Sequence, residues 1–234
     1  MTQFPDPDTV RPVVVQGFRA VWRASWPEER PGFGIYVLED PDAPLEQLDE
    51  AEFEATDERL PYFASLWPAG DSLAAAVLRA SIEPGAHILD LGCGVGAPGL
   101  AAAVHGGAVT FVDWDLRALE LVAHSATVLG VEPAALHARD WRRLEEDLRF
   151  DRVLGADLLY EARNVPAVLT VLAERLAPTG EAWVADPGRD GLATFLEALP
   201  GSGLRLIERR RLPQRPHGVA VTLLRIALLG HEPP

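Results

Sequence analysis

Length, composition and charge limit what this chain can be. It has 234 residues, of which 21 are basic and 35 acidic, for a formal charge of −14, and 48% of the residues are apolar. A protein that follows a phosphate backbone needs a basic face, so we expect no nucleic-acid partner. No apolar run approaches the ~18 residues of a membrane span, and the N-terminus lacks a basic-then-apolar signal. We therefore expect a cytoplasmic chain with no membrane partner.

Three types of side chain narrow the chemistry further. All 21 basic residues are arginine, which excludes a lysine Schiff base, a phosphate-loop lysine and a lysine nucleophile. The single cysteine, Cys93, excludes an intrachain disulfide and an all-cysteine metal site. The six histidines show no spacing typical of metal ligands on one helix. We therefore predict no metal site.

Residues 1–59 are expected to form an acidic N-terminal extension. The run Phe33–Leu38 is typical of a strand, and Val13–Trp22 is interpreted as another. The segment 40–58 is acidic and often interrupted. This pattern predicts an exposed loop or a short helix there.

From residue 60 onward, strands and helices are predicted to alternate. A helix is expected over Leu73–Ala80, capped by Asp71 or Ser72. The next strands are predicted at His87–Leu91, Val109–Asp113, Ala135–Ala138, Arg152–Ala156 and Glu181–Ala185, and the helices between and after them at Pro98–Val104, Leu116–Leu129, Val165–Leu176 and Leu192–Leu199. Two final strands, Leu204–Leu212 and Val219–Ile226, have no helix between them and should pair antiparallel. The alternation predicts an α/β fold with a parallel sheet covered by helices on both faces.

A glycine-rich turn carries the strongest functional signal. The sequence Ile88-Leu-Asp-Leu-Gly-Cys-Gly-Val-Gly-Ala-Pro-Gly99 runs from a buried strand into the start of a helix. Gly92, Gly94 and Gly96 permit positive φ and let a ligand approach the free N–H groups of the helix. We interpret the turn as the site of a nucleotide-like ligand. Because Gly92, Gly94 and Ala97 also satisfy the dinucleotide pattern G-x-G-x-x-G/A, the glycines alone do not identify that ligand.

Aspartates at three strand ends help to choose among ligands. Asp90 precedes the first glycine by two residues, where a carboxylate suits a ligand with an ammonium group and a sulfonium, such as S-adenosylmethionine. Asp113 ends the next strand and is placed to accept from both ribose hydroxyls of either ligand class. Asp140 ends the third strand and either accepts from the adenine amino group or caps the next helix. Trp114 and Trp141 either cover the adenine ring or belong to the core.

Four short segments carry a family resemblance. Residues Leu60–Ile226 resemble the seven-strand S-adenosylmethionine-dependent methyltransferases, and Asp157-Leu-Leu-Tyr160 resembles the Asp-x-x-Tyr motif of their protein-lysine methyltransferase group. Within that group the chain is similar to the electron-transfer-flavoprotein β-subunit lysine methyltransferase branch and its bacterial relatives. The other segments that carry the similarity are Leu66-Trp-Pro-Ala-Gly70, Leu89-Asp-Leu-Gly-Cys-Gly-Val-Gly96 and Ala185-Asp-Pro-Gly-Arg189.

The resemblance implies a fold and a division of the chain. It implies a Rossmann-like seven-stranded sheet, mostly parallel, with an antiparallel C-terminal hairpin strand and helices on both faces. Residues 60–234 would form the methyltransferase domain, preceded by the short extension 1–59.

The same resemblance implies a chemistry and roles for residues. S-adenosylmethionine would be the cofactor, S-adenosylhomocysteine its product, and a lysine side chain of a protein the substrate. Asp157 would hold the incoming amine and also border the cofactor, and Tyr160 would orient the amine or relay its proton. Trp67 would form the pocket wall against the methionyl part of the cofactor or the substrate stem.

Other functions stay open at this point. The same chemistry on a small-molecule amine is one alternative. An NAD(P)-dependent oxidoreductase on a Rossmann sheet is another, and a module that binds the cofactor without catalysis is a third. The chain has no Asn-Pro-Pro-Tyr-like motif after the fourth strand. That absence argues against a nucleic-acid base or a glutamine amide as the methyl acceptor.

Overall fold

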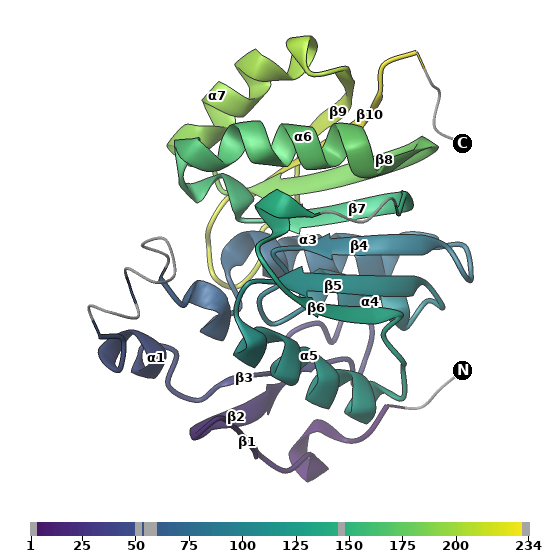
Figure 1. Cartoon of the computed structure of the whole chain (residues 1–234). Helices are drawn as coiled ribbons and strands as arrows, with labels where there is room; N and C mark the ends of the chain where they lie inside the picture. The colour runs from purple at the N-terminus through teal and green to yellow at the C-terminus, as the bar shows by residue number, and fades with distance from the viewer. Residues whose placement is uncertain (1–3, 50–52, 54–59, 145–147, 231–234) are drawn as a thin grey trace.

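The chain builds one large sheet and one small sheet (Figure 1). The computed structural model describes residues 4–49, 53, 60–144 and 148–230. The large sheet has seven strands in the order β6-β5-β4-β7-β8-β10-β9. Its strands are β4 (His87–Leu91), β5 (Ala108–Asp113), β6 (Ala135–Ala138), β7 (Phe150–Ala156), β8 (Leu176–Asp186), β9 (Leu204–Arg211) and β10 (Thr222–Leu228). The strands from β6 to β8 in this order run parallel, and β10 pairs antiparallel with β8 and β9. The predicted mostly parallel seven-stranded fold is confirmed.

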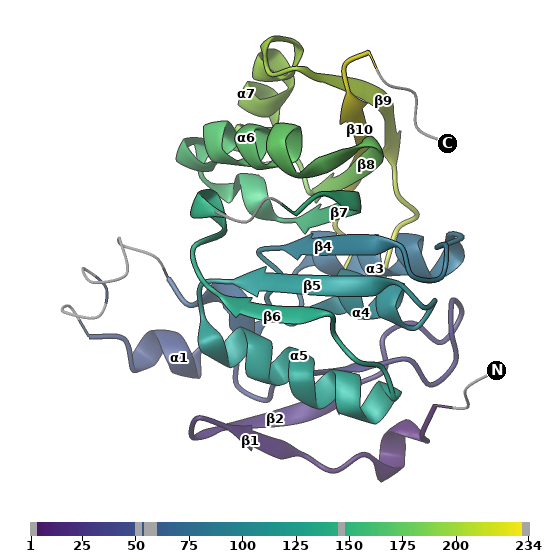
Figure 2. The ribbon, with the colours of Figure 1, turned by 45° about the vertical axis from the view of Figure 1, so that its right-hand side comes forward.

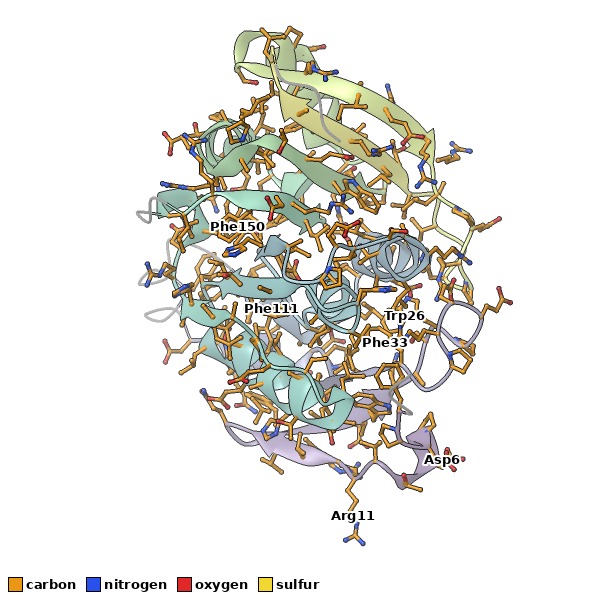
Figure 3. All side chains as sticks on the ribbon, turned by 90° about the vertical axis from the view of Figure 1, so that its right-hand side faces the viewer. Asp6, Arg11, Trp26, Phe33, Phe111 and Phe150 are labelled. Carbon is orange, nitrogen blue, oxygen red and sulfur yellow. The ribbon has the colours of Figure 1, made fainter. Side chains whose placement is uncertain are left out.

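Helices cover the two faces of the large sheet, and each face has its own core. The helices are α3 (Pro68–Arg79), α4 (Ala97–Ala103) and α5 (Leu116–Leu129) on one face, and α6 (Val165–Arg175) and α7 (Asp190–Ala198) on the other. Phe111 is buried in the first core and Phe150 in the second (Figure 3). Neighbouring residues of a strand point to opposite faces, so Val153 of β7 packs with the second core and Leu154 with the first.

Three strands within the N-terminal residues form a small antiparallel sheet. Its strands are β1 (Val13–Val15), β2 (Phe18–Arg23) and β3 (Ile35–Leu38). The single strand predicted over Val13–Trp22 is wrong, because Gln16 and Gly17 adopt φ of 47° and 92° and reverse the chain. The strand predicted over Phe33–Leu38 is confirmed in its last four residues.

This small sheet lies against α5, on the side of that helix away from β6 (Figure 2). The Tyr36 N–H donates to Ser125 Oγ at 2.8 Å, so β3 is hydrogen-bonded directly to the helix. Trp26 and Phe33 meet edge to face, with ring centroids 5.1 Å apart (Figure 3). Side chains of β3 and α3 belong to the same hydrophobic core.

The acidic segment 40–58 is only partly described. It contains the short helix α1 (Ala43–Glu46), in agreement with one of the two predicted forms. Residues 50–52 and 54–59 lie outside the described residues. The division of the chain at residue 59 therefore stays a prediction.

Helix α3 begins five residues earlier than predicted. Pro68 occupies its first turn, where a missing N–H costs nothing, and Trp67 is the N-cap residue without a side-chain cap. Asp71 and Ser72, the predicted caps, are buried inside the helix. The N–H of Ala69 donates instead to Asp157 Oδ2 at 3.0 Å. The cap is supplied by a residue distant in sequence, which no local pattern indicates.

Among the described residues, no helix is both long enough and apolar enough to cross a membrane.

Replacing Ser125 with Ala should destabilise the protein by about 1–3 kcal/mol, because the buried N–H of Tyr36 loses its partner. Thr127→Ala is the matched control, since the Thr127 hydroxyl donates to a carbonyl four residues back as Ser125 does, but is exposed. The control should change stability by less than about 0.5 kcal/mol. Urea unfolding of both variants measures the difference. Equal effects would contradict a hydrogen bond between the small sheet and α5.

Candidate active site

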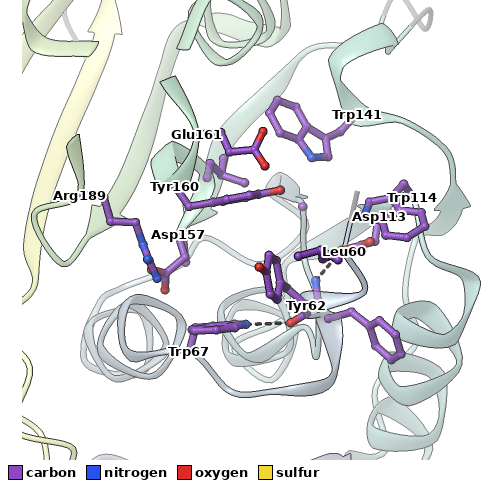
Figure 4. Close-up of a pocket in the computed structure, with 15 residues that line it drawn as sticks. Leu60, Tyr62, Trp67, Asp113, Trp114, Trp141, Asp157, Tyr160, Glu161 and Arg189 are labelled. Carbon is purple, nitrogen blue, oxygen red and sulfur yellow. Dashed lines mark hydrogen bonds and ion pairs between the residues drawn. The ribbon is translucent and has the colours of Figure 1, made fainter. Parts of the chain in front are cut away.

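A cavity of ≈ 410 Å³ opens at the edge of the large sheet where β4, β5, β7 and β8 end (Figure 4). Parallel strands bring their carboxyl ends to one edge, which is where ligands bind in open α/β sheets. Its walls are formed by Leu60, Tyr62, Phe63, Trp67, Gly92, Gly94, Asp113, Trp114, Trp141, Ala156, Asp157, Leu158, Tyr160, Glu161 and Arg189. A smaller hollow of ≈ 50 Å³ adjoins it under the glycine turn, and Asp90 lines this hollow.

The glycine turn between β4 and α4 needs its glycines. Gly92, Gly94 and Gly96 have φ of 60°, 50° and 73°. A Cβ at Gly96 would lie 2.5 Å from Val122, and a Cβ at Gly92 would lie 2.7 Å from Leu158. Because the turn has no side chains at these positions, its backbone faces the cavity. The first turn of α4 follows it directly.

Two buried aspartates hold this turn. Asp113 accepts from the Gly94 N–H at 2.8 Å and from the Asp115 N–H at 3.0 Å. Asp90 accepts from the Gly99 N–H in α4 at 2.9 Å. Burial raises the pKa of Asp90 to about 8 and that of Asp113 to about 6, in spite of these hydrogen bonds. Asp113 faces the main cavity, and Asp90 faces the smaller hollow.

The two tryptophans line the cavity, and Asp140 does not. Trp114 and Trp141 are both part of the wall, on the side of Asp113 (Figure 4). Asp140 caps the 3-10 helix Trp141–Arg143 through the N–H of Arg142 and forms an ion pair with its guanidinium at 2.9 Å. The structure thus shows the capping alternative for Asp140. Its contact with adenine stays a prediction.

Asp157 links three segments at the opposite end of the cavity. It follows β7 with a left-handed φ of 55°, which is uncommon for a residue other than glycine. One oxygen accepts from the Ala69 N–H, and the other pairs with the Arg189 guanidinium at 3.2 Å. Burial raises the pKa of Asp157, and Arg189 opposes that shift.

Aromatic side chains surround this end. Tyr160 lies in the 3-10 helix Leu158–Tyr160, and burial and the Glu161 charge raise its pKa, so its hydroxyl keeps its proton at neutral pH. Tyr62 meets Trp67 and Tyr160 edge to face, at centroid distances of 5.7 and 6.0 Å. The indole N–H of Trp67 donates to the Tyr62 carbonyl at 2.8 Å.

Sequence reasoning missed Tyr62, Phe63 and Glu161 as wall residues. Glu161 directly follows the Asp157–Tyr160 motif, and Tyr62 and Phe63 lie in the aromatic segment before α3. The concentration of aromatic residues at 62–67 is the signal that could have found Tyr62. Apart from Asp140 and Gly96, which are not part of either lining, the predicted site residues line the cavity or the smaller hollow. Their contacts with a ligand stay predictions.

The described part of the chain contains no group of three or more His, Cys, Asp or Glu side chains placed to hold a metal ion.

Comparison with known proteins defines the class. A family model described as a methyltransferase domain matches residues 82–208, more than half of the chain. The chain belongs to this family. It is an S-adenosylmethionine-dependent methyltransferase, and S-adenosylmethionine is its cofactor.

Two curated relatives and one solved structure are similar to the chain. The EEF1A lysine methyltransferase 3 of Mus musculus is 30% identical over 188 residues, which cover 75% of this chain and 78% of that protein. The electron transfer flavoprotein beta subunit lysine methyltransferase of Xenopus laevis is 30% identical over 132 residues, 55% of this chain and 53% of that protein. The N-methyltransferase NodS of Bradyrhizobium japonicum WM9, in complex with S-adenosylhomocysteine, shares the fold with a TM-score of 0.57 at 20% identity, covering 69% and 88% of the two chains.

The residues present fit this cofactor. The cavity has the size of a small-molecule site, and glycine backbone, two indole rings and a buried carboxylate line the same part of it. When bound, the cofactor supplies a methyl group on a positively charged sulfur.

Replacing Asp90 with Asn should flatten the dependence of stability on pH. The folded chain holds the Asp90 proton to a pKa of about 8, whereas an unfolded aspartate has a pKa of ~3.9. Without cofactor, the free energy of unfolding should therefore fall as pH rises between about 5 and 8. The Asn oxygen can still accept from Gly99, so the variant should lose most of this fall. Urea unfolding of both proteins at the two pH values tests it, and equal falls would contradict a buried, protonated Asp90.

Proposed function

We propose that the chain is a protein-lysine methyltransferase of the Asp-x-x-Tyr group, with Asp157 and Tyr160 at the amine end of its cavity. The main support for this proposal is the position of the Asp157 carboxylate, which lies in the cavity wall among aromatic side chains. Similarity to two lysine methyltransferases over 188 and 132 residues supports the same substrate class. A protein is accordingly the proposed partner.

The charge of the cavity supports two cationic ligands. Among the residues that the structure describes, the carboxylates of Asp113, Asp157 and Glu161 line it, against the guanidinium of Arg189. S-adenosylmethionine carries a sulfonium, and a free lysine carries an ammonium with a pKa of ~10.4. An excess of negative charge in a partly enclosed cavity attracts both cations.

The contacts of Asp157 leave it able to receive an ammonium group. A carboxylate has about four acceptor positions, and Asp157 uses three of them, for the Ala69 N–H and for two guanidinium N–H groups of Arg189. The fourth can accept from the incoming amine and orient it. Asp157 is too weak a base to take the proton of an ammonium directly, so the proton leaves to water.

Tyr160 is the second residue that we assign to the incoming amine. Because its raised pKa keeps the hydroxyl protonated, it donates or accepts hydrogen bonds and cannot act as an anionic base. The rings at this end exclude water from the amine, which favours its neutral, nucleophilic form. The chain's own contribution to the reaction is thus orientation and desolvation.

S-adenosylhomocysteine should raise the melting temperature of the purified chain, and NADH should not. A ligand that binds only the folded state stabilises it by about 2.7 kcal/mol at a concentration 100 times its Kd. Asp113→Ala should weaken S-adenosylhomocysteine binding, because this carboxylate is proposed to accept from the ribose. Thermal unfolding with each ligand measures both effects. Stabilisation by NADH alone would favour the oxidoreductase alternative.

Asp157→Asn should lower methyl transfer about 100-fold or more, with cofactor binding largely retained. Lysate proteins and a labelled methyl donor provide the assay, and mass spectrometry locates the label. Asp190→Asn is the control, since Asp190 is exposed at the start of α7 and does not line the cavity. Label on a protein lysine supports the proposal. Label only in small molecules contradicts it, and full transfer by Asp157→Asn refutes the role of Asp157.

A further inference from the structure

The last strand of the large sheet concentrates positive charge in an acidic chain. β9 holds four arginines and one glutamate in eight residues, whereas the whole chain has a formal charge of −14. It is the end strand of the sheet, beside β10 (Figure 2). No strand of the described part of the chain pairs with its other edge. A further extended segment can therefore lie along this edge.

Two of these arginines carry a charge that the protein itself does not balance. Arg209 and Arg211 are exposed and form no ion pair with any residue that the structure describes. The glutamate of the strand, Glu208, pairs instead with Arg210 and Arg225, at 3.3 Å in each case. Neighbouring residues of a strand point to opposite faces, so Arg209 and Arg211 share one face and Glu208 lies on the other.

An apolar side chain adjoins the two arginines. Arg209 is opposite Leu224 of β10, and Leu206 is opposite Ile226. Both β10 residues belong to the second core, and directly opposite residues of a strand pair point to the same face. Leu206 is 38% exposed, so it offers an apolar contact on the face of the arginines. We call Leu206, Arg209 and Arg211 the β9 patch.

The β9 patch begins at the edge of the sheet that also holds the cavity. Arg211 is opposite Thr222 of β10, and Thr222 is opposite Asp186, the last residue of β8. Asp157 lies at the same edge, since its N–H donates to the Ala185 carbonyl at 3.1 Å. Neighbouring strands lie about 4.8 Å apart, so roughly 15 Å separates the ends of β7 and β9.

The loop after β9 is held in place by buried charges. Arg215 pairs with Asp71 of α3 at 3.1 Å and with Glu29 at 2.7 Å. It also donates to the Ser25 carbonyl. These contacts fix the end of β9 against α3, whose first turn borders the cavity. The β9 patch therefore keeps its position relative to the cavity.

We propose that the β9 patch binds an extended acidic segment of the protein substrate, at a distance from the methylated lysine. This inference rests on the proposed function. Residues two apart in an extended chain point to the same side, so carboxylates in an acidic-x-acidic sequence match the spacing of Arg209 and Arg211. An extended chain advances about 3.3 Å per residue, which places the first of these carboxylates about five residues from the lysine.

The charges of the cavity and of the patch favour one orientation of the segment. Asp113, Asp157 and Glu161 line the cavity and repel acidic residues next to the lysine, whereas Arg209 and Arg211 attract them further along. Opposite charges at two places fix the register of a bound chain. A nucleic acid is negative along its whole length and would meet the repelling carboxylates, so a protein segment with separated charges fits better.

Peptide binding tests the occupant. Three fluorescein-labelled peptides of equal length carry one lysine and, about five residues later, three Glu at alternate positions, three Gln at the same positions, or three contiguous Glu. Fluorescence anisotropy measures their binding to the full chain with S-adenosylhomocysteine at low salt. The alternating Glu peptide should bind at least about fivefold more tightly than the Gln peptide. This preference should shrink at about 0.15 M salt.

Either of two results with these peptides would overturn the inference. Equal affinities of the alternating Glu and Gln peptides would show that the patch does not select carboxylates. Equal affinities of the alternating and contiguous Glu peptides would show that the spacing of the arginines is not matched by an extended segment.

Charge variants test the location of the site. Arg209→Gln/Arg211→Gln should reduce the preference to within about twofold, and Arg209→Lys/Arg211→Lys, which keeps the charge, should retain most of it. Arg11→Gln/Arg23→Gln is the control, because it removes the same charge from exposed positions beside and within the small sheet. Thermal unfolding confirms that each variant is folded. A preference that survives the Gln variant would refute the β9 patch and leave its arginines only the role of preventing association of edge strands.

Two other occupants would also overturn the inference. A labelled single-stranded RNA of similar length that binds more tightly than the acidic peptide, and loses affinity in the Arg209→Gln/Arg211→Gln variant, would identify a nucleic-acid site. A dimer in sedimentation that this variant abolishes would identify an interface between copies of the chain.

The two proposals can fail separately. If protein lysines in a lysate are methylated but the Glu and Gln peptides bind equally, the β9 patch is refuted and the proposed function stands. If the arginine-dependent preference is present but no lysine in the lysate is methylated, the proposed function is refuted and the binding site stands.

Discussion

One buried carboxylate joins the three segments that close one end of the cavity. Asp157, at the end of β7, binds the first turn of α3 through Ala69 and the segment after β8 through Arg189. Its left-handed backbone costs about 1–2 kcal/mol for a residue with a Cβ. Hydrogen bonds to a charged group contribute about 1.5–3 kcal/mol each, so the two contacts outweigh this strain. The position of Tyr160, three residues later, depends on the same arrangement.

The parallel order of the central strands explains why the two ends of the cavity are so different. β4 and β5 bring the glycine turn and Asp113 to the sheet edge, and β7 and β8 bring Asp157 and Arg189. The first pair presents backbone N–H groups and a carboxylate, which suit a nucleoside. The second pair presents rings and charge, which suit an amine. Because β4 and β7 are neighbours in the sheet, the two ends meet without a long loop between them.

Local sequence patterns predicted the central elements well and the contacts between distant segments poorly. The bounds of β4, β6 and α5 agree with prediction at both ends, and Asp115 and Gly130 mark the ends of α5. Pro68 marks the first turn of α3 locally, but the side chain that caps the helix, Asp157, is 88 residues away and could not be predicted. The glycine turn was predictable since its signal is local. The contact between Tyr62 and Tyr160 was not, because the two rings meet only after the sheet has formed.

Burial of Asp90 and Asp113 under the glycine turn lowers the free energy of unfolding near neutral pH. The fold alone does not require this loss of stability. Burial holds the pKa of Asp90 at about 8, so part of the stability available at low pH is lost near neutrality. An asparagine could accept from the Gly99 N–H without this loss. A cationic ligand beside the turn changes the balance, because it favours the ionised carboxylates and lowers both pKa values. Strongly shifted carboxyls at a ligand cavity are typical of functional sites.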